Sequence, residues 1–185
     1  MAPSYFTIGH SNRGLEEFIE LLRRSRVGLV ADVRKLPGSR LHPQFNSDAL
    51  AISLAERQIG YEHVAELGGR RGKVQEPVSS PNTFWENRSF RNYADYALGE
   101  DFRSGLRRLR QLGAVQPVAI MCSEAVWWRC HRRIIADYLL AGGDAVFHIL
   151  GPNNVTVATM TALARVTPEG ALTYPTKTPT RPLES

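Results

Sequence analysis

The sequence predicts a single α/β domain whose mostly parallel sheet is flanked by helices on both faces. Short apolar runs of strand length alternate with longer segments of helical periodicity, which is the order expected of parallel crossover units. The 185 residues, 43% of them hydrophobic, suffice for one domain with a substantial core. We predict a core domain over residues 1–150, a peripheral extension of the same domain over 151–174, and a disordered tail over 175–185.

The first part of the chain predicts a strand–helix–strand crossover. A strand covers Tyr5–Gly9, and Ser11 or Asn12 is expected to cap the helix that follows. The buried face of that helix is marked by apolar residues at helical spacing, namely Leu15, Phe18, Ile19 and Leu22. A second strand is predicted over Val27–Val33, so the carboxyl ends of both strands share one edge of the sheet.

Turn residues and apolar periodicity divide the rest of the chain into further elements. In chain order these are a loop over 35–46, a helix capped by Asn46 or Ser47 and running to about Gln58, a strand over Tyr61–Ala65, an irregular span over 66–88, a helix capped by Ser89, a helix over Asp101–Leu112, a strand over Val118–Met121, a helix from about Trp128 to Gly142, and a last parallel strand over Ala145–Ile149. Residues 153–174 predict a short helix and an edge hairpin around Pro168–Gly170.

Composition and charge limit the classes of function. The chain carries 23 basic and 18 acidic side chains, and its net charge of +5 favours anionic partners without establishing nucleic-acid binding. No apolar run is long enough to span a membrane, and the first residues lack the pattern of a signal peptide. Because only two cysteines are present and no export signal is seen, we expect a cytoplasmic protein. The sequence indicates neither a cofactor nor an oligomeric state.

The densest group of reactive side chains follows the predicted strand over Val118–Met121. Cys122 ends that strand, and Glu124 lies two residues later. The next helix is expected to open with guanidinium, thiol and imidazole groups, supplied by Arg129, Cys130, His131, Arg132 and Arg133. Because a helix amino terminus is itself partly positive, this cluster predicts a negative charge from elsewhere, supplied by Asp32, Glu124 or a bound anion.

Several motifs together resemble one known family. They are Thr7–Ser11 (TIGHS), Asp32–Arg34 (DVR), Pro37–Phe45, Leu67–Arg70 (LGGR), Ser89–Tyr96, Met121–Glu124 (MCSE) and Arg129–Arg132 (RCHR). These motifs resemble the domain of unknown function 488 family, a family of uncharacterised bacterial proteins, over about Tyr5–Leu150. The resemblance implies a compact α/β fold but names no reaction. One departure is Trp127, which stands where the family pattern has proline and affects the expected shape of that loop.

Ionisable side chains directly follow three separate predicted strands, and parallel strands bring their carboxyl ends to one edge. We therefore expect a single site there. The candidates for proton transfer are Glu124, Asp32 and His131. The candidates for a nucleophile are Cys122 and Cys130, and a position near a helix amino terminus favours a lowered pKa for Cys130. The anion-binding candidates are His10, Ser11, Arg34, Arg40, Arg129 and Arg132.

These groups predict an enzyme that acts on an anionic small substrate, namely a nucleotide or a nucleic-acid component. The arginines would hold the anion, and Trp127, Trp128 and Tyr61 would stack on a base. Alternatively, the tryptophans form a hydrophobic lid over the sheet edge. The sequence does not separate a hydrolase from a transferase.

Two further functions stay open. A nucleic-acid-binding module without catalysis is favoured by the Gly68–Lys73 loop and by the basic helix face over Arg103–Arg110. A metal-binding protein would draw its ligands from Cys122, Cys130, His131 and His10. Adjacent cysteine and histidine rarely bind one ion together, and the spacing of a zinc finger is missing, so no metal ligand is assigned.

Two readings of the cysteines are disfavoured. The segment between Cys122 and Arg129 holds one residue more than the anion-cradling loop of tyrosine phosphatases, and two tryptophans replace the glycines that let such a loop close. A Cys122–Cys130 disulfide would lack the Cys-x-x-Cys spacing of redox enzymes.

Overall fold

A computed structural model describes residues 4–69 and 79–176 of the chain. Its central feature is a six-stranded sheet. In spatial order the strands are β3 (Gly60–His63), β2 (Leu29–Asp32), β4 (Val118–Cys122), β1 (Ser4–Gly9), β5 (Ala145–Gly151) and β6 (Asn154–Val157). Every neighbouring pair is parallel except β5 and β6, so the predicted mostly parallel sheet is confirmed.

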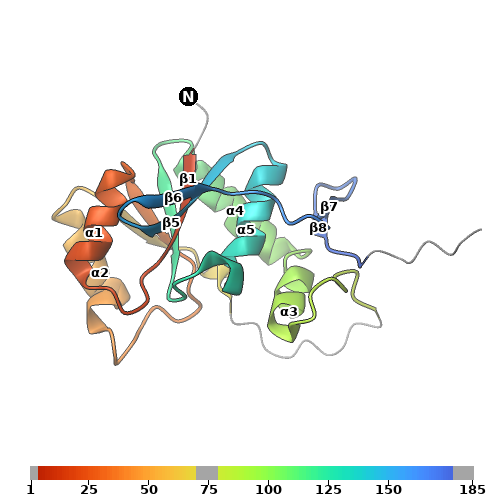
Figure 1. The fold of residues 1–185 in the computed structure, drawn as a ribbon, viewed down its shortest axis with the longest axis horizontal. Coiled ribbons are helices and arrows are strands. Elements are labelled where there is room, and N and C mark those ends of the chain that lie inside the picture. Colours follow the sequence, from red (N-terminus) through yellow and green to blue (C-terminus); the bar gives the residue numbers. More distant parts are fainter. Residues whose placement is uncertain (1–3, 70–78, 177–185) are drawn as a thin grey trace, which may run out of the picture.

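Helices cover both faces of this sheet, as the sequence predicts (Figure 1). They are α1 (Leu15–Arg24), α2 (Ser47–Ala55), α3 (Arg88–Tyr96), α4 (Glu100–Gly113) and α5 (Arg132–Ala141), with short 3-10 turns η1 (Pro43–Phe45), η2 (Ala65–Leu67) and η3 (Trp127–Arg129). The α1–α2 layer lies on one face and the α4–α5 layer on the other. Because side chains alternate between the two faces of a strand, each buried strand contributes to the core on both faces of the sheet. Val30 packs in the core under α1 and α2, while Leu29 and Ala31 pack in the core under α4 and α5.

Two helix starts differ from the prediction. Gly14 is the N-cap of α1, because the N–H of Ser11 bonds to the carbonyl of Ser123 and Ser11 takes a left-handed conformation with φ of 49°. The cap of α3 is Asn87, whose side chain accepts a bond from the N–H of Ser89 at 2.9 Å. The side-chain oxygen that caps α3 thus belongs to Asn87, which lies two residues before the predicted cap, Ser89.

The helix after β4 begins later than predicted, and this correction shapes the site. The turn η3 ends at Arg129, Cys130 is extended with φ of −130° and ψ of 149°, and α5 starts at Arg132 with His131 as its N-cap. Cys130 and His131 therefore lie in the connection before α5 and not in its first turns. The interruption brings the thiol of Cys130 against that of Cys122 at the end of β4.

After β5 the chain forms the edge strand β6 and then a hairpin of β7 (Arg165–Val166) and β8 (Leu172–Thr173). The hairpin around Pro168–Gly170 is confirmed, whereas residues 153–174, all of them described, contain no helix. Leu172 and Tyr174 are buried in the same core as the α4–α5 layer. Residues 177–185 of the expected tail lie outside the described residues. No described helix is both long and apolar enough to cross a membrane.

Candidate functional site

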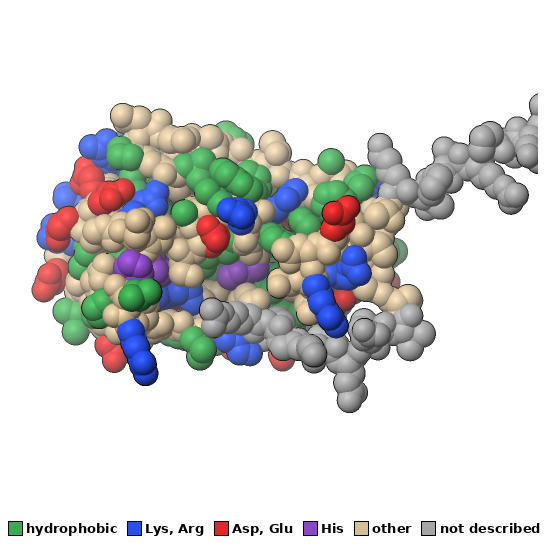
Figure 2. Space-filling model, turned by 60° about the horizontal axis from the view of Figure 1, so that its bottom comes forward, with side chains coloured by type: hydrophobic (Ala, Val, Ile, Leu, Met, Phe, Trp, Pro, Cys, Tyr) green, Lys and Arg blue, Asp and Glu red, His purple; other side chains and the backbone are tan. Residues whose placement is uncertain are grey.

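A pocket of about 640 Å³ opens where β1, β2 and β4 end. This volume falls within the range of about 300–1,000 Å³ that is usual for small-molecule sites. Its buried members include His10, Arg34 and Cys122, each of which ends or closely follows one of these strands. The face shown in Figure 2 carries histidine side chains (purple) in a recess, with Lys and Arg side chains (blue) beside them. The structure thus brings polar groups from three separate strand ends together, as the sequence predicts.

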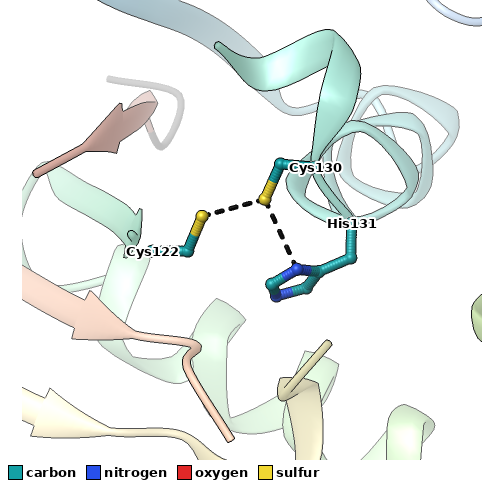
Figure 3. A group of neighbouring side chains, drawn as sticks. All are labelled: Cys122, Cys130 and His131. Atoms are coloured by element: carbon teal, nitrogen blue, oxygen red, sulfur yellow. Dashed lines mark hydrogen bonds between the residues drawn. The ribbon is translucent and has the colours of Figure 1, made fainter. Parts of the chain in front are cut away.

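Cys122, Cys130 and His131, which we call the thiol–imidazole cluster, line this pocket and point toward one another (Figure 3). The two sulfurs are 2.9 Å apart, and the Cys130 sulfur lies 3.4 Å from Nδ1 of His131. The other ring nitrogen, Nε2, is 2.9 Å from the carbonyl oxygen of Val33. Because a carbonyl only accepts, Nε2 carries a proton and Nδ1 is directed at the sulfurs. The cysteines are free thiols.

The environment of the cluster shifts the pKa values of the two thiols in opposite directions. Burial raises the pKa of Cys122 well above its usual value, and the hydrogen bond to Cys130 adds to the increase. Burial also opposes ionisation of Cys130. At that residue, however, the hydrogen bond from Cys122 and the charges of His131 and Arg132 outweigh burial and hold the pKa well below its usual value. Of the two thiols, Cys130 is therefore the one that ionises more readily.

Arg132 supports the cluster from inside the protein and does not line the pocket. It is 1% exposed, and its Nε donates to the Cys130 sulfur at 3.3 Å while NH2 donates to the carbonyl of Glu124. Among the described residues no carboxylate forms an ion pair with it. A buried cation requires a compensating charge, and the ionisable acceptors in contact with this one are the cysteine sulfurs.

The carboxylate of Asp32 is fully buried beneath the pocket and does not line it. It accepts bonds from the guanidinium of Arg34 and, at 2.7 Å, from the hydroxyl of Tyr61. Arg34 also reaches Nε2 of His10 at 3.3 Å. Asp32 and Arg34 thus form a buried ion pair at the base of the site. Tyr61, predicted to stack on a base, donates a hydrogen bond from its hydroxyl to Asp32 and is not among the residues that line the pocket.

His10 is neutral at physiological pH. Burial lowers its pKa to about 4, and Arg34 acts in the same direction, while the bond to the Ser11 carbonyl opposes them. The ring stacks on Phe45, with centroids 4.4 Å apart. His10 is not part of the thiol–imidazole cluster, so the structure brings together three of the four metal ligands considered from the sequence.

The remaining predicted residues are placed as follows. Ser11, Glu124 and Arg129 line the pocket, the last two from its exposed side, whereas Arg40 is exposed and lies outside the lining. Trp127 and Trp128 also lie outside it. The ring of Trp127, which was expected to stack on a base, has one face occupied by His148, with centroids 4.1 Å apart.

Several lining residues were not singled out from the sequence. They include Lys35, Leu36, His42, Gly69, Phe90 and Tyr93. Phe90 and Tyr93 lie three residues apart on one face of α3, and that face borders the pocket. Lys35 adjoins the Asp32–Arg34 motif, which was the available signal for it.

The basic face of α4 is partly neutralised. Arg107 donates to Glu100 at 2.8 Å, Arg108 pairs with Glu62, and Arg110 lies 3.3 Å from Asp144. The basic residues Arg70, Arg71 and Lys73 of the Gly68–Lys73 loop lie outside the described residues. Because Arg107, Arg108 and Arg110 are paired with carboxylates, α4 presents less net positive charge than its sequence suggests.

Comparison with known proteins identifies a family. The family described as Domain of unknown function DUF488 matches residues 14–139. This segment includes the Asp32–Arg34 pair and the whole thiol–imidazole cluster. No curated protein and no solved structure matches the chain.

Proposed function

The chain belongs to the DUF488 family, and we propose that it is a cytoplasmic enzyme that acts on an anionic small substrate in the pocket at the ends of β1, β2 and β4. The observation that carries the proposal is the thiol–imidazole cluster in the wall of a cavity of ligand size. Perturbed ionisable groups that contact one another in a cleft are characteristic of catalytic sites. The proposal covers hydrolysis and group transfer alike.

The charges around the opening favour an anion. Lys35 and Arg129 are exposed lining residues, and Arg34 adds a third cation whose charge is balanced by Asp32. Phe90 and Tyr93 border the same cavity and offer apolar surface to a ring. A nucleotide or nucleic-acid component combines phosphate with a flat base, so it matches both features.

Glu124 supplies the proton-transfer group of the proposal. Its side chain is exposed within the pocket lining, and its contact with the N–H of Val126 is long, at 3.4 Å. The carboxylate can therefore reorient toward a bound substrate without breaking a strong interaction. The neighbouring cluster is placed to meet the reacting end of that substrate.

A nucleic-acid-binding module without catalysis has less support. Ion pairs reduce the charge of α4, and the pocket is sized for a small molecule. Binding of DNA or RNA at low salt that is unaffected by changing Glu124 would favour this alternative.

Replacing Arg129 by alanine should weaken binding of a nucleoside monophosphate about tenfold, because one charge-assisted contact to phosphate is lost. Arg40→Ala is the matched control, since it removes the same charge from an exposed site outside the lining. Titration calorimetry at low ionic strength measures both affinities. Equal losses in the two variants would mean that the protein attracts anions only through its net charge, and would contradict the proposed pocket.

Glu124→Gln should lower turnover at least about a hundredfold and leave binding and thermal stability nearly unchanged. The wild-type protein is first screened against phosphomonoesters, phosphodiesters and nucleotides for product formation. The variant is then compared on any substrate that is converted. Full activity in the variant removes Glu124 from the mechanism, and a variant that fails to fold shows that the residue is structural.

A further inference from the structure

We infer that the thiol–imidazole cluster is a zinc site, with Cys122, Cys130 and His131 as three ligands and a fourth position open to the pocket. The inference concerns the same pocket as the proposed enzyme, and it rests on that proposal only for the use to which the metal is put. Two thiolates and an imidazole form a donor set that zinc prefers.

The distances within the cluster suit one ion. The three ligand atoms lie within 4.8 Å of one another. Ligand bonds of about 2.3 Å to sulfur and about 2.0 Å to nitrogen at tetrahedral angles place sulfur roughly 3.6 Å from nitrogen. The observed separation of the Cys130 sulfur and His131 Nδ1 is 3.4 Å. The same geometry sets two sulfurs roughly 3.8 Å apart, so the present 2.9 Å contact opens by side-chain rotation when the ion enters.

The hydrogen bonds around the cluster are those of a metal site. His131 directs Nδ1 at the sulfurs while Nε2 is bonded to the Val33 carbonyl, and such a second bond fixes the ring of a metal-binding histidine. The N–H of Glu124 lies 3.3 Å from the Cys122 sulfur, and Nε of Arg132 lies 3.3 Å from the Cys130 sulfur. Each sulfur thus receives an N–H donor, which stabilises the thiolate form that zinc binds.

The buried charge of Arg132 determines the charge expected of the fourth ligand. Zinc with two thiolates and a neutral imidazole carries no net charge, which leaves the guanidinium of Arg132 beside a neutral centre. A fourth ligand with negative charge would balance this cation. The exposed cations Lys35 and Arg129 border the same opening, so an anionic ligand entering from the pocket meets favourable charge on both sides.

The backbone removes the objection that adjacent cysteine and histidine rarely bind one ion. Cys130 is extended while His131 has a helical conformation, with φ of −56° and ψ of −18°. This change of conformation between neighbours turns both side chains toward Cys122 (Figure 3). Three protein ligands with an open fourth position characterise catalytic zinc, whereas structural sites use four.

The test begins with the full chain, purified without a metal-binding tag, in reducing buffer free of chelator. Mass spectrometry of the elements should find one zinc per chain. Chelator treatment should remove it, and titration with cobalt alone should then produce thiolate-to-metal absorption. Because the chain has only 2 cysteines, thiol alkylation reports on Cys122 and Cys130 alone and should be slower with zinc than without it. Absence of metal from chains whose thiols both titrate as free thiols after denaturation would overturn the inference, as would a Cys122–Cys130 disulfide under these conditions.

Variants locate the metal. Cys122→Ser and Cys130→Ser should lose zinc. Gly69→Ala tests the site without changing a ligand, because an added Cβ would overlap Nδ1 of His131, and zinc affinity should fall at least tenfold. Gly38→Ala is the matched control, since Gly38 also lines the pocket but its added Cβ would meet nothing closer than 3.9 Å. Unchanged zinc content in all three variants would overturn the assignment. If they fail to fold, alkylation of the wild-type chain decides it.

The outcomes separate this inference from the proposed function. Stoichiometric zinc in a protein that neither binds nor converts any anion supports the metal site and contradicts the enzyme. Turnover by fully zinc-free protein, with both thiols reactive, supports the enzyme and overturns the metal site.

Discussion

Asp32→Ala is expected to destabilise the protein by about 3–5 kcal/mol, because it leaves a buried cation without its partner. The carboxylate accepts bonds from both the backbone and the guanidinium of Arg34, and also from the hydroxyl of Tyr61. Asp32 is fully buried and Arg34 is 7% exposed, so water cannot replace the lost bonds. Such a loss is a large share of the roughly 5–15 kcal/mol that stabilises a typical domain. Urea denaturation followed by circular dichroism measures it.

The control for this prediction is Glu20→Ala, which removes a carboxylate from an exposed pair with Arg24. That change should cost less than about 0.5 kcal/mol. The double variant Asp32→Ala/Arg34→Met should regain part of the stability, since the unpaired charge is then absent. A loss below about 1 kcal/mol for Asp32→Ala would show that the pair contributes little.

Acidification should destabilise the fold through two buried histidines. Burial lowers the pKa of both His10 and His148 to about 4, from an ordinary value of 6.5. Between these values the unfolded chain binds protons that the folded chain does not, so stability falls as the pH decreases from about 6.5 toward 4. Each histidine should remove about 2 kcal/mol between pH 7 and pH 5.

Urea denaturation at a series of pH values between 7 and 5 measures this dependence. His148→Gln should remove about half of the slope and keep an acceptor for the hydroxyl of Thr7, which His148 Nδ1 contacts at 2.7 Å. The stability of the variant at pH 7 serves as its own reference. Equal slopes in variant and wild type would contradict the assignment to His148.

The sequence predicted the side of the pocket formed by the strand ends better than the side formed by the loops and α3. The periodicity and length of the apolar runs located the ends of β1, β2 and β4. Parallel pairing of these strands then required His10, Arg34 and Cys122 to lie close together. Predicting that these residues lie close together needed only local sequence patterns and the rule that parallel strands end at one edge of the sheet. The order of the strands was not encoded locally, because the pairing of β1 with β4 and β5 joins distant parts of the chain.

The start of α5 could not be predicted because a tertiary contact overrides propensity. Apolar residues at helical spacing predicted a helix from about Trp128, but the ring of Trp127 stacks on His148 of β5 and Arg132 folds back onto the carbonyl of Glu124. Arg132 was expected to bind an anion because it belongs to a cluster of arginines beside two thiols and an imidazole, whereas the structure buries it. Its burial depends on acceptors that only the assembled fold provides.

The central position of β1 governs how the chain can assemble. Tyr5 is flanked by Val118 on one side and Val146 on the other, so β1 is synthesised well before either of its neighbours, β4 and β5. Until then its amides and carbonyls stay unmatched on both sides, a condition that invites association with other chains. Pairing of β1 therefore waits for the synthesis of β4 and β5, and such long-range closure is intrinsically slow.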